Sequence, residues 1–502
     1  MSLDPTRFTV DAQGLLTGHP EEEFSQVMWS HLERAPWVVL SVLAHAVALL
    51  LVYLMIDGDQ SEDQAIAVSI QQDDREDPIL VEPEPVETVE PEDVPDDLPQ
   101  DAEIVPLPEA PENVSDVQPV DFTVSDFDYP SSIGIGDRPR GGNLSGRVAG
   151  GKKLPRPTYT AIVHGLEWLK DHQDEDGRWD SDGFMKHDSG GAPTDGAGLP
   201  THDVGVTGLA LLAFLGDGNT MRTGPYRHVV KRGVTWLLEQ QSTDGLFGTA
   251  NSSDYIYDHA IAAYAVCEAY GLSNYRILRK FAQLGIDYLE SHRNPYSVWR
   301  YQPRDGDNDL SVTGWCVMAY KSAQDFGLEV NTNALENASA YLDQITDPNT
   351  GHAGYQKLEE PSSRQVGDHA TRFPPERGEA MTAVGLFCRF FLGQDPAENK
   401  LMARAADTIL AKPAVWADDG SIDHYYWYYA TYALYQMGGE RWWGRWYRLL
   451  DPAVVQTQRN DGNFAGSWDA AGAWGDDGGR IYSTAMSVLT LEAFYRYTKL
   501  VR

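Results

Sequence analysis

The sequence predicts an all-α protein whose C-terminal two thirds fold as a series of helical hairpins. Two observations support this prediction: a short residue pattern recurs along the chain, and two types of helix alternate after about residue 157. Self-similarity of this kind is typical of stacked units that cannot bury their apolar faces alone. A third observation, an uncharged run of twenty residues near the N-terminus, predicts a separate membrane segment.

The repeated pattern is a glycine, an aromatic residue and a leucine at positions one, four and five, followed by a glutamine, a glycine and an aromatic residue. The first three positions share one face of a helix, which we expect to pack inward. The glutamine can bond free backbone groups near the helix end, and the last aromatic residue covers the turn. The copies are Gly165, Trp168, Leu169, Gln173, Gly177 and Trp179; Gly233, Trp236, Leu237, Gln241, Gly245 and Phe247; Gly285, Tyr288, Leu289, Arg293 and Trp299; and Gln458, Gly462 and Phe464.

The helices after residue 157 divide into amphipathic outer helices and inner helices rich in Ala, Gly, Thr and aromatic residues. Six helices of each type are enough to close a ring. Outer helices are expected near 158–173, 228–241, 278–292, 333–345, 398–411 and 441–457. Inner helices are expected near 204–215, 258–271, 309–324, 378–392, 424–437 and 481–497.

The repeated residues resemble the QW motif of the squalene cyclase and prenyltransferase repeat family. The first two copies match every position of that motif. The resemblance implies an (α/α)6 toroid of six inner and six outer helices over residues 157–498, with a central cavity that binds isoprenoids in the enzymes of the family. Aromatic residues of the inner helices are then expected to contact an apolar or polymeric ligand, and we name Trp315, Tyr264, Trp427 and Tyr428.

Aspartates stand at or near the start of four predicted inner helices: Asp203, Asp258, Asp309 and Asp423. An Asp at this position accepts free amide hydrogens and complements the positive end of the helix dipole, so capping explains all four. The run Asp307-Asn308-Asp309 also resembles part of the DxDD acid motif of squalene-hopene cyclases. That resemblance implies Asp309 as proton donor beside Asp307, although Leu310 occupies the position of the last motif aspartate.

Metal and cofactor chemistry receives little support from the residues. A zinc site of the kind that protein prenyltransferases use would need Asp309, Cys316 and His424 to converge, and the companion ligands of that family are missing. The acidic loops at 174–184 and 305–309 lack EF-hand spacing, so we interpret them as solvated turns. Cys267, Cys316 and Cys388 all lie in predicted helices, which argues against a disulfide framework. We therefore expect no metal and no cofactor.

The chain carries a formal net charge of −36, most of it in one segment. Residues 57–130 hold 24 Asp and Glu against a single Arg, together with 11 prolines. Such a segment cannot bury enough apolar surface to fold, so residues 57–156 are predicted to be a disordered linker, acidic and Pro-rich and then Gly-rich. A nucleic-acid partner is not expected, because phosphate binding needs a basic stripe.

Residues 37–56 contain no charge if His45 is neutral, and twenty helical residues span roughly the 30 Å of a hydrocarbon layer. We predict one transmembrane helix there, after a cytoplasmic tail at 1–36. Arg34 precedes it and the acidic linker follows, which favours a cytoplasmic N-terminus and a periplasmic toroid. A cleaved signal peptide is the competing interpretation.

Ser41 and His45 are four residues apart in this segment and share one helix face. They are either tolerated polar residues or a contact for a membrane partner. The run SVLAH in a single N-terminal span is similar to the anchor of TonB-type energy transducers. This resemblance implies that Ser41 and His45 meet a proton channel like the ExbB–ExbD complex in the inner membrane. The sequence thus predicts a membrane-anchored binding or scaffold module, with an isoprenoid cyclase as the alternative.

Overall fold

The computed structural model describes residues 155–362, 373–374 and 377–493, which all belong to one compact unit. The predicted tail at 1–36, the predicted membrane segment at 37–56 and nearly all of the predicted linker lie outside the described residues. Within the described residues, no helix combines the length and the apolar character that crossing a bilayer requires. The described part is all-helical and contains no β-strand.

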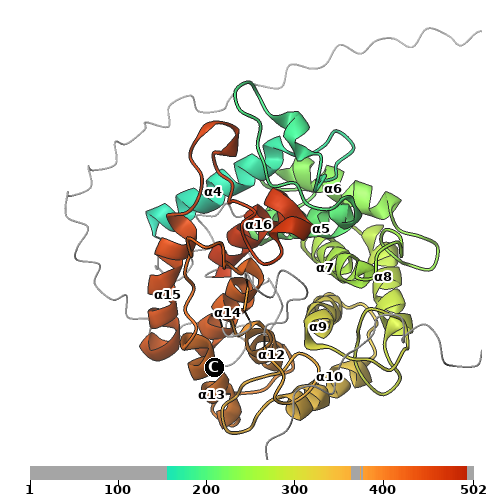
Figure 1. Cartoon of the computed structure of the whole chain (residues 1–502). Coiled ribbons are helices and arrows are strands. Elements are labelled where there is room, and N and C mark those ends of the chain that lie inside the picture. The colour runs from blue at the N-terminus through green and yellow to red at the C-terminus, as the bar shows by residue number, and fades with distance from the viewer. Residues whose placement is uncertain (1–154, 363–372, 375–376, 494–502) are drawn as a thin grey trace, which may run out of the picture. The chain divides into compact units, whose positions relative to one another are not determined.

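Six inner helices form a closed ring around the centre of this unit (Figure 1). Each packs against the next in chain order, and the last packs back against the first. They are buried on nearly every side; in the first of them every residue from Val204 to Gly216 is buried. They are α5 (Asp203–Gly216), α7 (Tyr255–Ser273), α9 (Leu310–Asp325), α12 (Ala380–Phe391), α14 (His424–Met437) and α16 (Gly475–Leu491).

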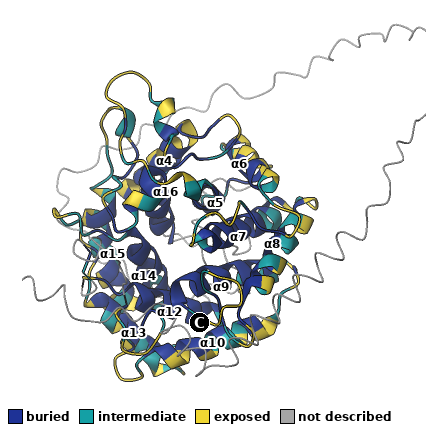
Figure 2. Ribbon diagram, turned by 45° about the vertical axis from the view of Figure 1, so that its right-hand side comes forward, coloured by how far each residue is buried: buried dark blue, intermediate teal, exposed yellow. Residues whose placement is uncertain are grey.

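Outer helices surround the inner ring and bury only the face that meets it (Figure 2). They are α4 (Arg156–Asp171), α6 (Arg227–Glu239), α8 (Leu278–His292), α10 (Thr332–Ile345), α13 (Lys400–Leu410) and α15 (Arg445–Leu450). Two π-helical segments, η5 (Gly439–Gly444) and η6 (Asp451–Val455), flank α15. Helix α4 contacts both α16 and α5, so the outer layer also spans the point where the ring closes. The described helices therefore form the predicted toroid of inner and outer helices.

Short 3-10 helices occupy the loops at η2 (Phe184–His187), η3 (Pro200–His202) and η7 (Gly462–Phe464). The predicted helix bounds agree with the structure to within a few residues, except in the last outer and the last inner helix. The outer helix predicted at 441–457 is α-helical only over Arg445–Leu450, and π-helical segments take up most of the rest. The last inner helix is α16. That helix begins at Gly475, six residues before the predicted start, and bends at Gly479, whose φ is 67°. Its predicted end at 497 lies outside the described residues.

The repeated glutamines join each hairpin to the next outer helix. The amide nitrogen of Gln173 donates to the carbonyl oxygen of Gly177 in its own loop at 2.8 Å and to that of Val229 in α6 at 3.0 Å. Gln241 repeats this arrangement with Gly245 at 3.1 Å and Phe281 in α8 at 3.0 Å. One side chain thus satisfies a loop carbonyl and a helix carbonyl, which would otherwise be costly to bury.

The repeated glycines and aromatic residues form the junction between units. Gly177 has φ +107° and lies so close to the carbonyl of Arg232 that any Cβ would collide with it. Gly245 meets α8 in the same way, so these turns need glycine both for space and for the left-handed conformation. The indole nitrogen of Trp179 donates to the carbonyl of Leu169 at 2.7 Å, which locks the ring over the turn.

The last copy of the pattern was predicted with the wrong glycine and aromatic residue. Gln458 donates to the carbonyl of Gly466 at 2.9 Å, and Trp468 donates through its indole to Val454 at 2.7 Å. These contacts match those of the first copy, so Gly466 and Trp468 take the positions that the sequence pattern gave to Gly462 and Phe464. Four additional residues in the loop shift the true positions, and local spacing alone cannot reveal an insertion.

Candidate functional site

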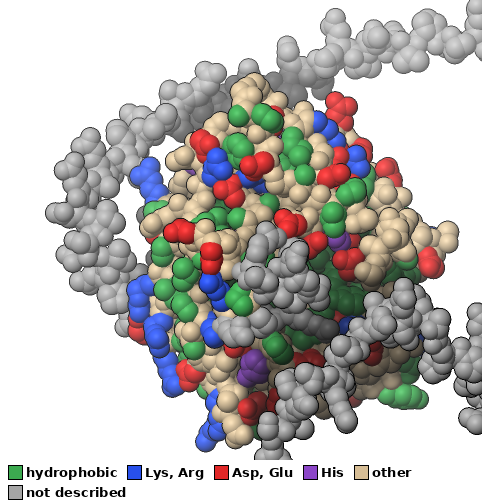
Figure 3. All heavy atoms as spheres, in the orientation of Figure 1, with side chains coloured by type: hydrophobic (Ala, Val, Ile, Leu, Met, Phe, Trp, Pro, Cys, Tyr) green, Lys and Arg blue, Asp and Glu red, His purple; other side chains and the backbone are tan. Residues whose placement is uncertain are grey.

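A cavity of about 460 Å³ opens where the first turns of the inner helices converge. All six inner helices contribute to its wall, which explains why residues far apart in the chain meet there. The space-filling view shows a hollow near the middle of this face, with hydrophobic side chains inside and acidic and histidine side chains at its edge (Figure 3). One lining residue from each helix in turn is Gly205, Tyr257, Ser311, Ala380, Tyr425 and Tyr482.

The cavity wall combines aromatic rings with charged groups. Tyr301, Tyr355 and Trp474 come from the loops that precede inner helices, and Trp315 comes from α9 itself. Four aspartates and two cationic residues complete the polar part of the wall: Asp254, Asp258, Asp423, Asp477, His202 and Arg300. The six helix N-termini that surround the cavity place partial positive charge there, which stabilises this concentration of carboxylates.

His202 and Asp258 form an ion pair on the cavity wall, with His202 Nδ1 at 3.1 Å from Asp258 Oδ2. Burial lowers the pKa of His202, but the hydrogen bond and charge of Asp258 outweigh it and raise the value to about 9. Burial also raises the pKa of Asp258, and His202 opposes this effect. Gly205 packs directly against the Asp258 carboxylate, where a Cβ would collide with it. The glycine therefore makes room for the pair.

Asp309 is the N-cap of α9, as the sequence predicted, and its side chain is fully buried. Oδ1 accepts from the backbone nitrogen of Val312 at 2.8 Å, while Oδ2 accepts from the Tyr355 hydroxyl at 3.3 Å and lies 3.5 Å from Arg300 Nε. Burial raises the pKa of Asp309 to about 7, against the opposing hydrogen bond from Val312 and the charge of Arg300. Asp309 does not line the cavity, but Tyr355 and Arg300 do.

Asp307 lies in different surroundings from Asp309. Its side chain is 67% exposed and pairs with Arg300 Nη1 at 2.7 Å. Leu310, on the position of the last aspartate of the cyclase motif, is completely buried. Arg300 therefore connects one solvent-facing and one buried carboxylate, and the three positions of the motif do not converge on the cavity.

Of the other three aspartates near the starts of inner helices, one caps its helix and two do not. Asp423 caps α14 by accepting from the backbone nitrogen of Tyr426 at 3.0 Å. The capping prediction is wrong for Asp203, which accepts from Ser181 instead, and for Asp258. Both helices begin earlier than the pattern suggests, α5 through η3 and α7 at Tyr255, so these aspartates lie within the first turn.

The aromatic residues predicted to contact a ligand occupy three kinds of position. Trp315 lines the cavity, whereas Tyr264 and Tyr428 are buried in the packing between inner helices and are not part of its wall. Trp427 borders a separate cavity of about 240 Å³ next to Lys412. The sequence analysis missed Tyr257, because an inner-helix aromatic residue faces the cavity only if it lies in the first turns, and the sequence does not say which end of the ring is open.

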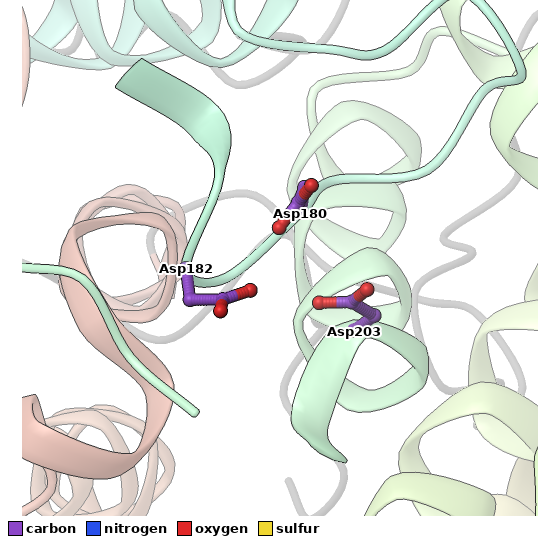
Figure 4. Close-up of side chains that lie close together, drawn as sticks. All are labelled: Asp180, Asp182 and Asp203. Atoms are coloured by element: carbon purple, nitrogen blue, oxygen red, sulfur yellow. The ribbon is translucent and has the colours of Figure 1, made fainter. Parts of the chain in front are cut away.

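Three acidic side chains converge between the loop after α4 and the start of α5: Asp180, Asp182 and Asp203 (Figure 4). One oxygen from each lies within 4.8 Å of the others. Arg178 pairs with Asp180 at 3.3 Å and with Asp203 at 3.0 Å, and Lys186 pairs with Asp180 at 2.9 Å. Arg178 and Lys186 already offset the negative charge of this cluster, so we interpret the ion pairs as interactions that hold the loop against the start of α5.

The residues of the zinc hypothesis do not form a group. Among the described residues, Asp309, Cys316 and His424 are not within ligand distance of one another. The three cysteines are free and buried, as their helical positions predicted. Burial raises the pKa of the Cys388 thiol to about 12, so this sulfur is a packing group rather than a thiolate.

Comparison with known proteins identifies no family for this chain. No protein family model matches the chain, and no curated protein does. A variant of an α-1,6-mannanase from Salegentibacter sp. aligns at 10% identity and a TM-score of 0.46 over 67% of this chain and 98% of the mannanase. Cellobiose 2-epimerase from Bacillus thermoamylovorans aligns at 13% and 0.45 over 66% of this chain and 98% of the epimerase. Type II terpene cyclase MstE from Scytonema aligns at 13% and 0.40 over 67% of this chain and 96% of the cyclase.

The fold and the cavity define the class of this chain: it is an α/α-toroid protein with an aromatic and acidic cavity at the N-terminal ends of its inner helices.

Proposed function

We propose that this protein is a membrane-anchored binding protein whose toroid holds a small ligand in the cavity at the start of the inner helices. The observation that carries the proposal is the convergence of all six inner helices on one cavity of about 460 Å³. Ligand sites of about 300–1,000 Å³ that combine aromatic walls with a few polar groups are the usual form of small-molecule sites. The ion pair of His202 and Asp258 gives this wall a fixed polar element.

Binding is tested by blocking the mouth of the cavity. Ser253 is exposed and lines the cavity, so Ser253→Trp closes the mouth with little strain on the core. Thr243→Trp, in an exposed loop position outside the lining, is the matched control. The full chain is purified from membranes in mild detergent, and small molecules that remain bound are detected by native mass spectrometry. A bound species should be present in the wild type and in Thr243→Trp and absent from Ser253→Trp; equal spectra for all three would refute a cavity ligand.

Anchoring in the inner membrane is the second part of the proposal. It is supported by the uncharged run at 37–56, by Arg34 before it and by the acidic segment after it. A reporter fused after residue 130 should be active only when it is exported from the cytoplasm. Activity of the reporter inside the cytoplasm would reverse the orientation and remove the periplasmic assignment.

Acid catalysis by Asp309 is a second candidate function, an isoprenoid cyclase. It is favoured by a buried carboxyl whose pKa is raised to about 7 and which accepts from Tyr355 on the cavity wall. A proton donor must stay neutral at the working pH, and this carboxyl is partly protonated there. The four carboxylates on the wall argue against an isoprenoid cyclase, because a bound hydrocarbon would desolvate them without offering hydrogen bonds in return.

The cyclase candidate is tested with the full chain and squalene. Asp309→Asn keeps an oxygen that can accept from Val312 but cannot deliver a proton, so the melting temperature should change little. If the protein is a binding module, the wild type converts no squalene. A cyclised product from the wild type that disappears in Asp309→Asn would instead make the enzyme the primary function.

A further inference from the structure

Two hydrogen-bond donors in the cavity wall have no partner in the protein. The indole nitrogen of Trp474 and the hydroxyl of Tyr482 are both almost completely sequestered, and neither makes a hydrogen bond. Both residues line the cavity, from the loop before α16 and from its second turn. Buried donors without a partner are rare and cost about 1–3 kcal/mol each, so a ligand oxygen that reached either atom would be stabilised by the hydrogen bond.

The same wall also offers acceptors. The side chain of Asp254 is 41% exposed at the cavity, and its Oδ2 lies 3.8 Å from His202 Nε2, beyond hydrogen-bond distance. A carboxylate has four lone-pair positions and no hydrogen to donate, so it selects donor groups on a ligand. A ligand that matches this wall therefore carries hydrogen-bond acceptors near Trp474 and Tyr482 and hydrogen-bond donors near Asp254.

Aromatic faces form the rest of the wall. Trp315 lines the cavity and stacks on Tyr428 behind it, with ring centroids 6.0 Å apart and an interplanar angle of 12°. Tyr425 and Trp474 pack edge to face, with ring centroids 6.5 Å apart and an interplanar angle of 70°. Held rings of this kind offer flat apolar surface at a low cost in conformational entropy.

Three ligand classes can be compared with this wall. A hydrocarbon would satisfy neither the donors nor the carboxylates, and a cation would satisfy the carboxylates but offer nothing to Trp474 and Tyr482. Hydroxyl groups both donate and accept, and a pyranose ring adds a flat C–H face for the aromatic side chains. A cavity of about 460 Å³ has room for a short oligosaccharide.

We propose that the cavity binds an uncharged, hydroxyl-rich ligand of the oligosaccharide class, with Trp474 and Tyr482 donating to its oxygens. This inference rests on the proposed function, since it names the ligand class of the same cavity. Trp474 and Tyr482 act as specificity-determining residues, because they distinguish a hydroxyl-rich ligand from a cation.

The test uses the full chain in lipid nanodiscs and isothermal titration with neutral trisaccharides (maltotriose, cellotriose, chitotriose and mannotriose), spermidine and squalene. At least one trisaccharide should bind. Tyr482→Phe keeps the ring and removes only the hydroxyl donor, so it should weaken that binding about 3- to 10-fold. Trp474→Phe removes the indole N–H and also reduces the bicyclic ring to a phenyl ring, so it should weaken binding by at least as much. Trp442→Phe and Tyr226→Phe, outside the cavity wall, are the matched controls and should leave the affinity unchanged.

The outcomes separate this inference from the proposed function. Binding of spermidine or squalene that Ser253→Trp abolishes, without binding of any trisaccharide, would overturn the ligand class and leave the binding cavity in place. No binding of any probe, together with no native ligand lost in Ser253→Trp, would overturn both. Trisaccharide binding that is equally strong in Trp474→Phe, Tyr482→Phe and the wild type would overturn the role of the two donors.

Discussion

The side-chain nitrogen of Gln458 donates to the carbonyl oxygen of Ala161 at 2.8 Å, although 297 residues separate them. Ala161 lies in α4, the first described helix, and Gln458 follows η6, near the end of the ring. The bond repeats, across the closing point, the contact that Gln173 makes with Val229 between neighbouring units. The toroid is thus closed by the same interaction that builds it.

Replacing Gln458 should weaken the closed ring. Gln458→Ala removes the bonds to Ala161 and Gly466, so the unfolding free energy should fall by about 1–3 kcal/mol and the melting temperature with it. Gln173→Ala should cost a similar amount. Gln283→Ala, which removes exposed hydrogen bonds from α8 to Asp287 and to the backbone of Glu329, is the control. A loss at Gln458 no larger than that at Gln283 would show that the closing bond adds nothing to stability.

Asp309 should make the stability of the toroid depend on pH. The pKa of Asp309 is about 7 in the folded chain against an ordinary value of 3.8, so the folded state binds the proton more tightly than the unfolded state. Its contribution to stability is therefore largest below about pH 4 and is lost as pH rises to about 7, by at most about 1.4 kcal/mol per pH unit. Asp309→Asn should remove this dependence. Urea unfolding at several pH values checks it, and parallel curves for the two proteins would contradict the prediction.

Glycine at position 205 should be essential for the ion pair on the cavity wall. Gly205→Ala places a methyl group against the Asp258 carboxylate, so it should destabilise the fold by about 1–3 kcal/mol and lower the pKa of His202 toward its ordinary value. Gly385→Ala is the matched control, because the nearest atom to its Cβ, in Leu342, is 3.4 Å away. That substitution should be neutral or stabilise α12 by up to about 1 kcal/mol. Thermal unfolding and NMR titration of His202 measure the two effects, and equal results for the two glycines would contradict the packing argument.

Replacing His45 should separate anchoring from energy coupling. If residues 37–56 span the membrane as proposed, His45→Leu removes a polar group from the lipid, so membrane insertion should persist. If Ser41 and His45 contact a proton channel like ExbB–ExbD, its recovery with the tagged full chain should be lost. Ala46→Leu changes the next residue along the chain, which would lie off the face that Ser41 and His45 share in the predicted helix, and should retain the partner. If His45→Leu recovers as much of the channel as the wild type does, Ser41 and His45 are polar residues that the segment tolerates and do not contact the channel.

The candidate site could be predicted only in part from the sequence. Asp309 was found because an N-cap is a local feature, in which the side chain bonds an amide three residues later. The burial that raises its pKa was not predictable, and neither were the Tyr355 hydroxyl and the Arg300 charge, which reach the carboxyl from other loops and oppose that rise. The pair of His202 and Asp258 joins residues 56 positions apart, and no spacing rule indicates such a pair.

The sequence alone determined the all-helical architecture and most helix bounds, because helix formation depends on apolar periodicity and end signals within a few residues. It also determined the number of inner and outer helices, and six of each are enough to close a ring. Tertiary structure decided which end of the ring opens into a cavity, which aromatic residues line it and that Gly466, not Gly462, completes the last unit. Those features depend on packing and desolvation between segments distant in the chain, and local sequence patterns carry no information about either.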